Sequence, residues 1–149
     1  MTTSMHNKHM LQRVFDALSA GDSRPFVAAM ANEVTWTVMG HTPWSATYRG
    51  RPAVLELLRQ LGARLAERYR ATAELILADG DYVVVAATGR ASTKEGIAYN
   101  NQYCFIFRLR DHAIVEVAEY LDTELLVKAL GAASPAEDGL SAADELRTK

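Results

Sequence analysis

Apolar side chains recur at helical spacing in the first part of the chain and alternate with polar ones in the rest. Residues 5–20 predict an amphipathic helix, and a shorter helix follows Asp22 or Ser23 and is expected to end near Asn32. A third helix is predicted after Gly50. The three apolar stripes are Met10, Leu11, Val14, Phe15 and Leu18; Phe26, Val27 and Met30; and Val54, Leu55, Leu58, Leu61 and Leu65.

Strand patterns dominate the middle and the end of the chain. Residues 33–39 alternate β-branched and aromatic side chains with others and predict a strand, whereas residues 40–50 are predicted to form a loop. Between residues 69 and 122, three turn signals separate four β-rich runs, which predicts an antiparallel meander followed by a short helix over residues 123–130. The turn signals are Asp79-Gly-Asp81, Thr93-Lys-Glu-Gly96 and Arg110-Asp-His112.

This order of elements predicts an α+β fold shaped like a cone. We expect a strongly curved antiparallel sheet with three N-terminal helices packed on its concave face, a short C-terminal helix, and a pocket between helices and sheet. The length of 149 residues suits one domain, which we place at residues 1–131. Residues 132–149 are rich in small and charged residues and are predicted to be a flexible tail or a frayed helix.

Composition and motifs narrow the function. The 16 basic and 18 acidic residues form no basic stripe, which disfavours nucleic-acid binding. The single Cys104 and four scattered histidines predict neither a disulfide nor a metal site, and phosphate-loop and serine-elbow motifs are absent. Without a signal sequence or a run of about 20 apolar residues, we expect a cytoplasmic protein that does not insert into membranes. No cofactor is implied.

Two neighbouring strands each carry an apolar line that one polar residue interrupts, Asn101 in the first and Glu119 in the second. A three-residue loop, 110–112, would let both lines face the interior, with Leu109 opposite Ala113 and Tyr103 opposite Glu119. The lines are Ile97, Tyr99, Asn101, Tyr103, Phe105, Phe107 and Leu109, and Ala113, Val115, Val117, Glu119 and Leu121. We therefore predict that an amide, a phenol and a carboxylate meet among apolar walls.

Such a group of side chains is suited to acid/base catalysis. Burial would raise the pKa of Glu119 towards neutrality, and Tyr103 or Asn101 could donate a hydrogen bond to a developing oxyanion. Each residue also has a structural interpretation: Glu119 would reach water or a tyrosine hydroxyl, and Asn101 would satisfy backbone groups at a bulge. Asp122 either faces the pocket or caps the last helix.

Ligand contacts are predicted from five further residues, although for Trp36 plain core packing is the favoured interpretation. The loop over the mouth supplies an indole and the histidine best placed for a second proton transfer, while the inward strand lines supply the rest. These candidate contacts are Trp36, His41, Trp44, Tyr99 and Val117.

The chain resembles the SnoaL-like, ketosteroid-isomerase-related family of the nuclear transport factor 2-like superfamily over residues 5–130. The stretches that carry this resemblance are Val34-Thr-Trp36 with Gly40 and Pro43, Tyr48-Arg-Gly-Arg51, Tyr99-Asn-Asn-Gln-Tyr103, and Ile114 through Glu119-Tyr-Leu-Asp-Thr123. The family includes polyketide cyclases, steroid isomerases, epoxide hydrolases and members without known activity. The fold that the resemblance implies therefore does not name a reaction.

The resemblance implies that a pocket carboxylate, here Glu119, moves a proton beside a carbonyl of an apolar or aromatic ligand. A glutamate stands where the resemblance leads us to expect an aspartate. The rival interpretation is a non-catalytic binding or accessory protein, and epoxide hydrolysis ranks lower because the Arg90-Ala-Ser92 stretch lacks the required second carboxylate. The resemblance also implies a homodimer through the outer sheet face, which the alternation assigns to Ile76, Ala98, Cys104, Ile106 and Ala118.

Overall fold

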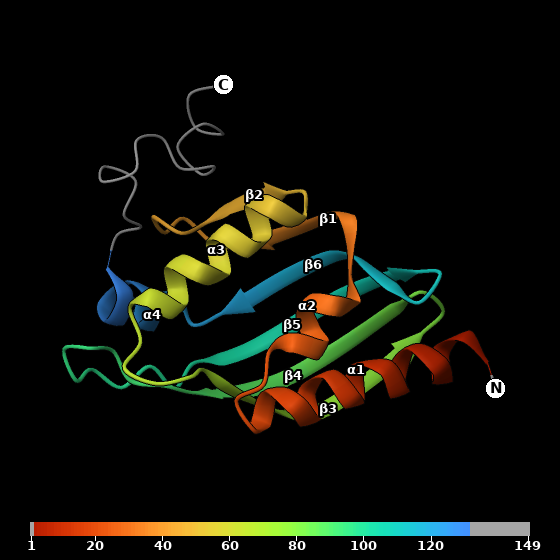
Figure 1. The fold of residues 1–149 in the computed structure, drawn as a ribbon, viewed down its shortest axis with the longest axis horizontal. Helices are drawn as coiled ribbons and strands as arrows, with labels where there is room; N and C mark the ends of the chain where they lie inside the picture. Colours follow the sequence, from red (N-terminus) through yellow and green to blue (C-terminus); the bar gives the residue numbers. More distant parts are fainter. Residues whose placement is uncertain (1, 132–149) are drawn as a thin grey trace.

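The computed structural model describes residues 2–131 and confirms the α+β cone (Figure 1). The tail predicted for residues 132–149 lies outside the described residues. Within residues 2–131, four helices and six strands follow one another. They are α1 (Thr3–Ser19), α2 (Arg24–Ala29), β1 (Met30–Val38), β2 (Ala46–Arg49), α3 (Arg51–Ala63), β3 (Arg70–Asp79), β4 (Tyr82–Arg90), β5 (Gln102–Arg110), β6 (Ala113–Leu121) and α4 (Thr123–Leu130).

The strands form one sheet in the order β2-β1-β6-β5-β4-β3. The meander from β3 to β6 is antiparallel, as predicted, but β1 runs parallel to β6, so the sheet is mixed. A parallel pair needs a long connection, and helix α3 with the rest of the meander supplies it here. The predicted antiparallel sheet is therefore confirmed for every strand pair except this one.

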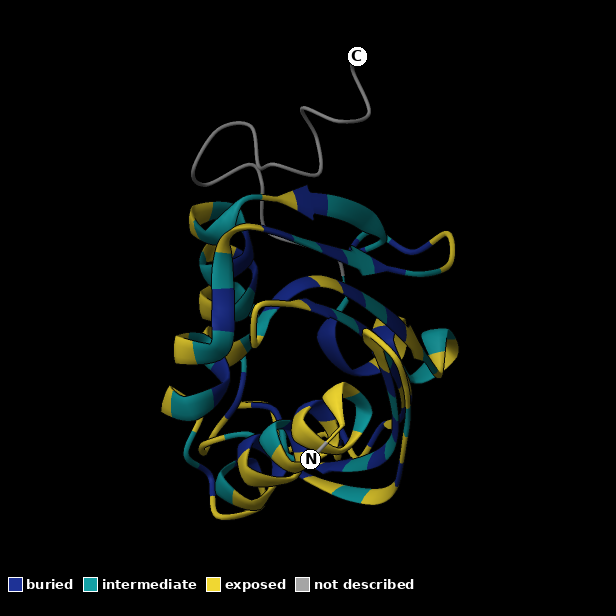
Figure 2. Ribbon diagram, turned by 90° about the vertical axis from the view of Figure 1, so that its right-hand side faces the viewer, coloured by how far each residue is buried: buried dark blue, intermediate teal, exposed yellow. Residues whose placement is uncertain are grey.

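The helices cover the concave face from two sides. Helix α1 packs on β3 and β4, whereas α3 packs on β1 and β2, so the middle strands β5 and β6 lie beneath the space between them (Figure 1). Figure 2 shows the sheet curling around the helices, with buried residues along its inner face. None of the helices between residues 2 and 131 has the length and apolar character needed to cross a bilayer.

Two predicted boundaries were wrong near the first strand. Helix α2 ends at Ala29 and β1 begins at Met30, earlier than the expected change near Asn32. The predicted loop over residues 40–50 contains the short strand β2, in which Tyr48 pairs with Trp36 of β1. Pairing with a neighbouring strand, rather than a local sequence pattern, makes this segment extended.

The hairpin between β5 and β6 has a different register from the one predicted. Its loop has two residues, Asp111 and His112, with φ of 51° and 64°, and Arg110 pairs with Ala113. A bulge in the following strand then buries both Ile114 and Val115. The bulge, not the loop, returns the apolar line of β6 to the interior. The predicted Leu109–Ala113 and Tyr103–Glu119 pairs are therefore wrong.

As a result of this register, Phe105 pairs with Glu119 and Tyr103 pairs with Leu121.

A second bulge, between Ala73 and Leu75 in β3, also changes which side chains face the interior, here at the edge of the sheet. It turns Ile76 into the core, where the side chain is buried, and leaves Leu75 exposed on the outer face. The prediction that placed Ile76 on that face was therefore wrong.

Candidate functional site

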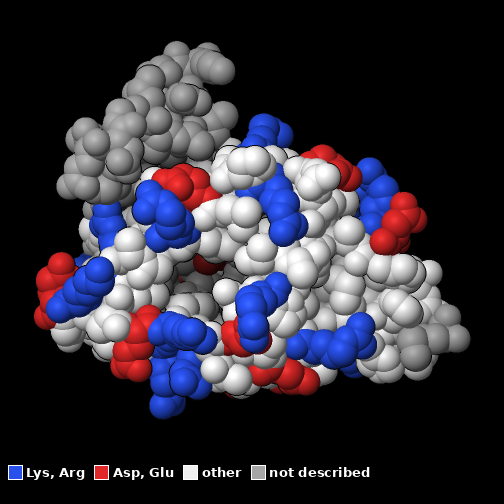
Figure 3. Space-filling view, viewed as in Figure 1, with Lys and Arg blue, Asp and Glu red and all other residues white. Residues whose placement is uncertain are grey.

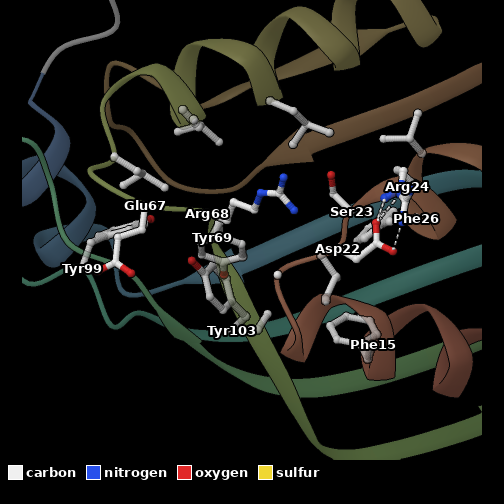
Figure 4. Close-up of a pocket in the computed structure, with 18 of the residues that line it drawn as sticks. Phe15, Asp22, Ser23, Arg24, Phe26, Glu67, Arg68, Tyr69, Tyr99 and Tyr103 are labelled. Carbon is white, nitrogen blue, oxygen red and sulfur yellow. Dashed lines mark hydrogen bonds and ion pairs between the residues drawn. The ribbon is translucent and has the colours of Figure 1, made fainter.

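A cavity of about 1030 Å³ opens between the helices and the concave face of the sheet (Figure 4). Its size lies at the upper end of the ~300–1,000 Å³ typical of small-molecule sites. Apolar side chains from all three N-terminal helices and from the sheet form most of its wall. Examples are Phe15 and Leu18 of α1, Phe26 of α2, Leu58 of α3, Trp36 of β1 and Phe105 of β5.

Glu119 lies in this cavity on β6, and its side chain is only 7% exposed. The Nε1–H group of Trp36 donates a hydrogen bond of 2.8 Å to its Oε1 atom. Oε2 has no hydrogen-bond partner among residues 2–131. Since every fully buried side-chain nitrogen or oxygen atom in these residues does have a partner, Oε2 is not fully buried. Oε2 therefore opens onto the cavity, where it is the atom available to a ligand.

The surroundings of Glu119 favour its neutral form. Burial raises the pKa of the carboxyl group from 4.5 to about 7, and the hydrogen bond from Trp36 opposes this shift. A carboxyl group of this pKa holds a proton in about half of the molecules at neutral pH, so it can both accept and donate one. The burial and raised pKa expected from the sequence thus agree with the geometry of the cavity.

Replacing Trp36 with phenylalanine should raise the pKa of Glu119 by about one pH unit, because a hydrogen bond to the ionised form is lost. The phenyl ring would keep the apolar contact with Phe26, whose ring centroid lies 5.7 Å from that of Trp36. NMR titration of the glutamate carboxyl carbons would measure the change. Trp44→Phe is the matched control, because its indole donates to the carbonyl oxygen of Gly131 instead. An unchanged midpoint in Trp36→Phe would contradict the assigned role.

Three tyrosines, Tyr69, Tyr99 and Tyr103, line the same cavity. Burial is the main cause that raises their pKa values, to about 12 for Tyr99 and well above the ordinary value for Tyr69 and Tyr103. The charge of Glu119 raises all three further. Their hydroxyl groups therefore keep their protons at neutral pH, as hydrogen-bond donors to an oxyanion must.

Gly89 on β4 provides room for two of these rings. A Cβ atom at this position would lie 2.7 Å from the hydroxyl oxygen of Tyr69 and 3.0 Å from Cε2 of Tyr103. The rings of these tyrosines meet edge to face, with centroids 6.3 Å apart. A residue without a side chain is thus required behind the phenol pair.

Asn101 is fully buried but does not line the cavity. Its Oδ1 atom accepts hydrogen bonds from the backbone N–H groups of Gln102 and Asp122, and its Nδ2 group donates to the carbonyl of Asp122 and the hydroxyl of Tyr99. The amide therefore joins the start of β5 to the end of β6. It reaches the cavity through Tyr99, 3.2 Å from Nδ2.

The remaining predicted contacts lie in different places. Val117 is buried in the core, Trp44 packs beneath the guanidinium of Arg64, and His41 is exposed in the loop before β2. None of these three is among the residues that line the cavity. Asp122 caps α4, since its side chain accepts a hydrogen bond from the N–H group of Leu125.

The model of the SnoaL-like domain matches residues 11–117, well over half of the chain. This chain belongs to the SnoaL-like family. The resemblance inferred from the sequence is thereby confirmed, and Glu119 lies two residues beyond the matched stretch. No curated protein matches the chain.

Solved structures share the fold of this SnoaL-like domain. A nuclear transport factor 2-like protein of unknown function from Burkholderia pseudomallei is 21% identical, with 89% of this chain and 100% of that chain covered and a TM-score of 0.74. A putative SnoaL-like polyketide cyclase from Jannaschia sp. CCS1 is 16% identical, with 89% and 96% covered and a TM-score of 0.73.

A protein with a ketosteroid-isomerase-like fold from Catenulispora acidiphila, in complex with trimethylamine, is also similar. It is 16% identical, with 83% of this chain and 92% of that chain covered and a TM-score of 0.67. At identities this low, these structures show a shared fold and do not assign an activity to this SnoaL-like domain.

Two residues that sequence reasoning missed stand next to each other in the site. Tyr69 and Arg68 lie in the segment between α3 and β3, where no periodic pattern distinguishes a cavity side chain from an exposed one. In the part of the chain that the structure describes, no three His, Cys, Asp or Glu side chains are arranged to hold a metal ion.

Proposed function

We propose that this SnoaL-like protein is a cofactor-independent isomerase or cyclase that transfers a proton next to a carbonyl group of an apolar or aromatic ligand. One observation carries the proposal. The carboxyl group of Glu119 has a pKa of about 7, and one of its oxygens is held by Trp36 while the other faces an apolar cavity. A base for carbon acids at neutral pH needs these properties.

In the proposed reaction, Oε2 of Glu119 removes a proton from the carbon beside the carbonyl. The C–H electron pair forms a C=C bond, and the carbonyl oxygen takes up the negative charge of the enolate. The phenol groups of Tyr103 and Tyr69 donate hydrogen bonds to this oxygen in the scheme. Tyr103 is also a donor predicted from the sequence. Asn101 acts in this scheme by positioning Tyr99.

The second half of the reaction distinguishes the two enzyme classes. In an isomerase, Glu119 returns its proton to a different carbon of the enolate. In a cyclase, the enolate carbon bonds to a second carbonyl carbon of the same ligand, and the proton goes to the resulting alkoxide. Both steps balance without an oxidant, a reductant or a cofactor.

The experiment that tests this proposal compares proton transfer and binding in Glu119→Gln and in the wild-type protein. Hydrogen–deuterium exchange beside the carbonyl of β-tetralone, followed by NMR, reports the proton-transfer step without knowledge of the natural substrate. An enzyme loses exchange in Glu119→Gln and keeps most of its affinity for the ketone.

The alternative function is a non-catalytic binding or accessory protein. The apolar lining of the cavity favours it as much as it favours an enzyme, because an apolar ligand needs only the wall. A binding protein would hold β-tetralone without accelerating its exchange. Epoxide hydrolysis ranks below both, since Arg90 is exposed and does not line the cavity.

We also propose a homodimer through the outer sheet face. Exposed or half-buried apolar residues there include Cys104 and Ile106 of β5 together with Leu75 and Leu77 of β3, which are 53% and 55% exposed. Ile106→Asp should convert a dimer into monomers in sedimentation velocity, because a charge would be buried at the interface. Val127→Asp on α4 is the control. A wild-type monomer would contradict this proposal.

A further inference from the structure

Four of the charged side chains that line the cavity lie near its mouth. Asp22, Arg24, Glu67 and Arg68 line it together with the buried Glu119. Figure 3 shows a hollow with lysine and arginine side chains around its rim and acidic atoms at its floor. A ligand that enters must therefore pass between charged groups before it meets the apolar wall.

Two of these charges neutralise each other. The Nε and Nη2 atoms of Arg24 lie 2.9 and 3.0 Å from the two carboxylate oxygens of Asp22. Oδ1 of Asp22 also accepts the backbone N–H of Arg24 at 3.0 Å. This hydrogen bonding lowers the pKa of Asp22 to about 2. The hydrogen-bonding groups of Asp22 and Arg24 are thus largely used within this pair, so few remain to bind a ligand.

Arg68 has no such partner. Within residues 2–131 its guanidinium makes no hydrogen bond and no ion pair, and it acts on Asp22 only through longer-range attraction. In Figure 4 its side chain extends across the cavity towards Ser23, whereas the neighbouring Glu67 lies beside Tyr99 at the other end. Among the described residues, the cation therefore forms no ion pair with either acid at the mouth.

The residues around Arg68 connect it with the interior. The next residue, Tyr69, turns its phenol inward against Tyr103, and the apolar wall continues through Phe105 to Glu119. A ligand that spans the cavity would place a carbonyl at the buried end and its other end at the guanidinium. The volume of about 1030 Å³ is large enough for a compound of several rings.

We propose that Arg68 recognises an anionic oxygen group on the ligand, so that the substrates are aromatic or multi-ring carbonyl compounds that carry a carboxylate or a similar oxyanion. The position of the carbonyl rests on the proposed function, but the anion contact does not. Planar guanidinium groups bind oxyanions through two parallel hydrogen bonds, and an arginine at a cavity mouth keeps this capacity only when no acid occupies it.

Two fluorescent probes with the same aromatic body test the proposal. Anilinonaphthalene sulfonate carries a sulfonate, whereas N-phenylnaphthylamine is neutral. In Arg68→Gln we expect Kd for the sulfonate to rise about three- to fivefold, as for a partly exposed ion pair, with Kd for the neutral probe unchanged. Arg13→Gln, an exposed position on α1 outside the cavity lining, removes the same charge and should leave both values unchanged.

Further measurements separate the possible results. Arg68→Lys should restore part of the sulfonate affinity, and added salt should weaken sulfonate binding more in the wild-type protein than in Arg68→Gln. Equal affinity of wild type and Arg68→Gln for the sulfonate overturns the anion contact and leaves the proposed proton transfer standing. Failure of both probes to bind the wild-type protein overturns the contact and the ligand cavity together.

Discussion

Glu119→Gln is expected to lower the rate of exchange beside the carbonyl of β-tetralone by about 10²- to 10⁴-fold, the range for loss of a positioned general base. Glutamine has nearly the same shape and still accepts the hydrogen bond of Trp36 through its amide oxygen. It cannot take up a proton at neutral pH, so the base is lost and the cavity is kept. Binding of the ketone should change little.

The matched control for this experiment is Glu116→Gln. Glu116 lies on the same strand but is exposed, and its carboxylate pairs with Arg108 at 2.8 Å. Its replacement removes the same charge from the chain without touching the cavity. Comparable exchange rates in wild type and Glu119→Gln, with the ketone bound by both, would refute catalysis by Glu119 and support the binding protein.

The same substitution should stabilise the fold at alkaline pH. The pKa of Glu119 is about 7 in the folded protein against an ordinary 4.5. Between these values the folded chain holds a proton that the unfolded chain has released, so the free energy of unfolding falls as pH rises. The loss is absent below pH 4.5 and complete above pH 7. Glu119→Gln avoids it and should be about 3 kcal/mol more stable than wild type at pH 8.

Urea denaturation of both proteins at pH 5 and pH 8 would measure this difference. At pH 5 we expect the advantage of Glu119→Gln to shrink below about 1 kcal/mol, because pH 5 lies only half a unit above the ordinary pKa of 4.5, so the wild type has lost little stability there. Glu116→Gln should not gain stability at pH 8 relative to wild type, since Arg108 lowers the pKa of that exposed carboxyl group. A difference that does not depend on pH would contradict the shifted pKa of Glu119.

The architecture was largely predictable because most helices and strands are indicated by their own local sequence. The apolar stripe of α1, the turn residues of the meander and the Asp122 cap of α4 each fix an element through its own sequence. Strand β2 did not, because its extended form depends on pairing with β1. The parallel β1–β6 pair is likewise a property of the assembled sheet rather than of either strand.

Only the buried end of the candidate site, on β5 and β6, was predictable from the sequence. An interrupted apolar line correctly indicated that Asn101 and Glu119 are buried, but the same signal serves two different roles. The amide of Asn101 is saturated by backbone groups, whereas Glu119 keeps one oxygen open to the cavity. Arg68 could not be recognised as part of the cavity, since only the folded chain brings its segment close to α2.

The bulge at Ile114 and Val115 makes the site sensitive to length. A strand alternates sides with each residue, so Glu119 faces the cavity only because of the number of residues between the Asp111–His112 turn and its own position. Deleting one residue from this stretch would turn the carboxylate to the outer face while leaving the amino acid itself intact. In a lineage with this hairpin, single-residue insertions and deletions would therefore end or create a pocket acid as effectively as substitutions do.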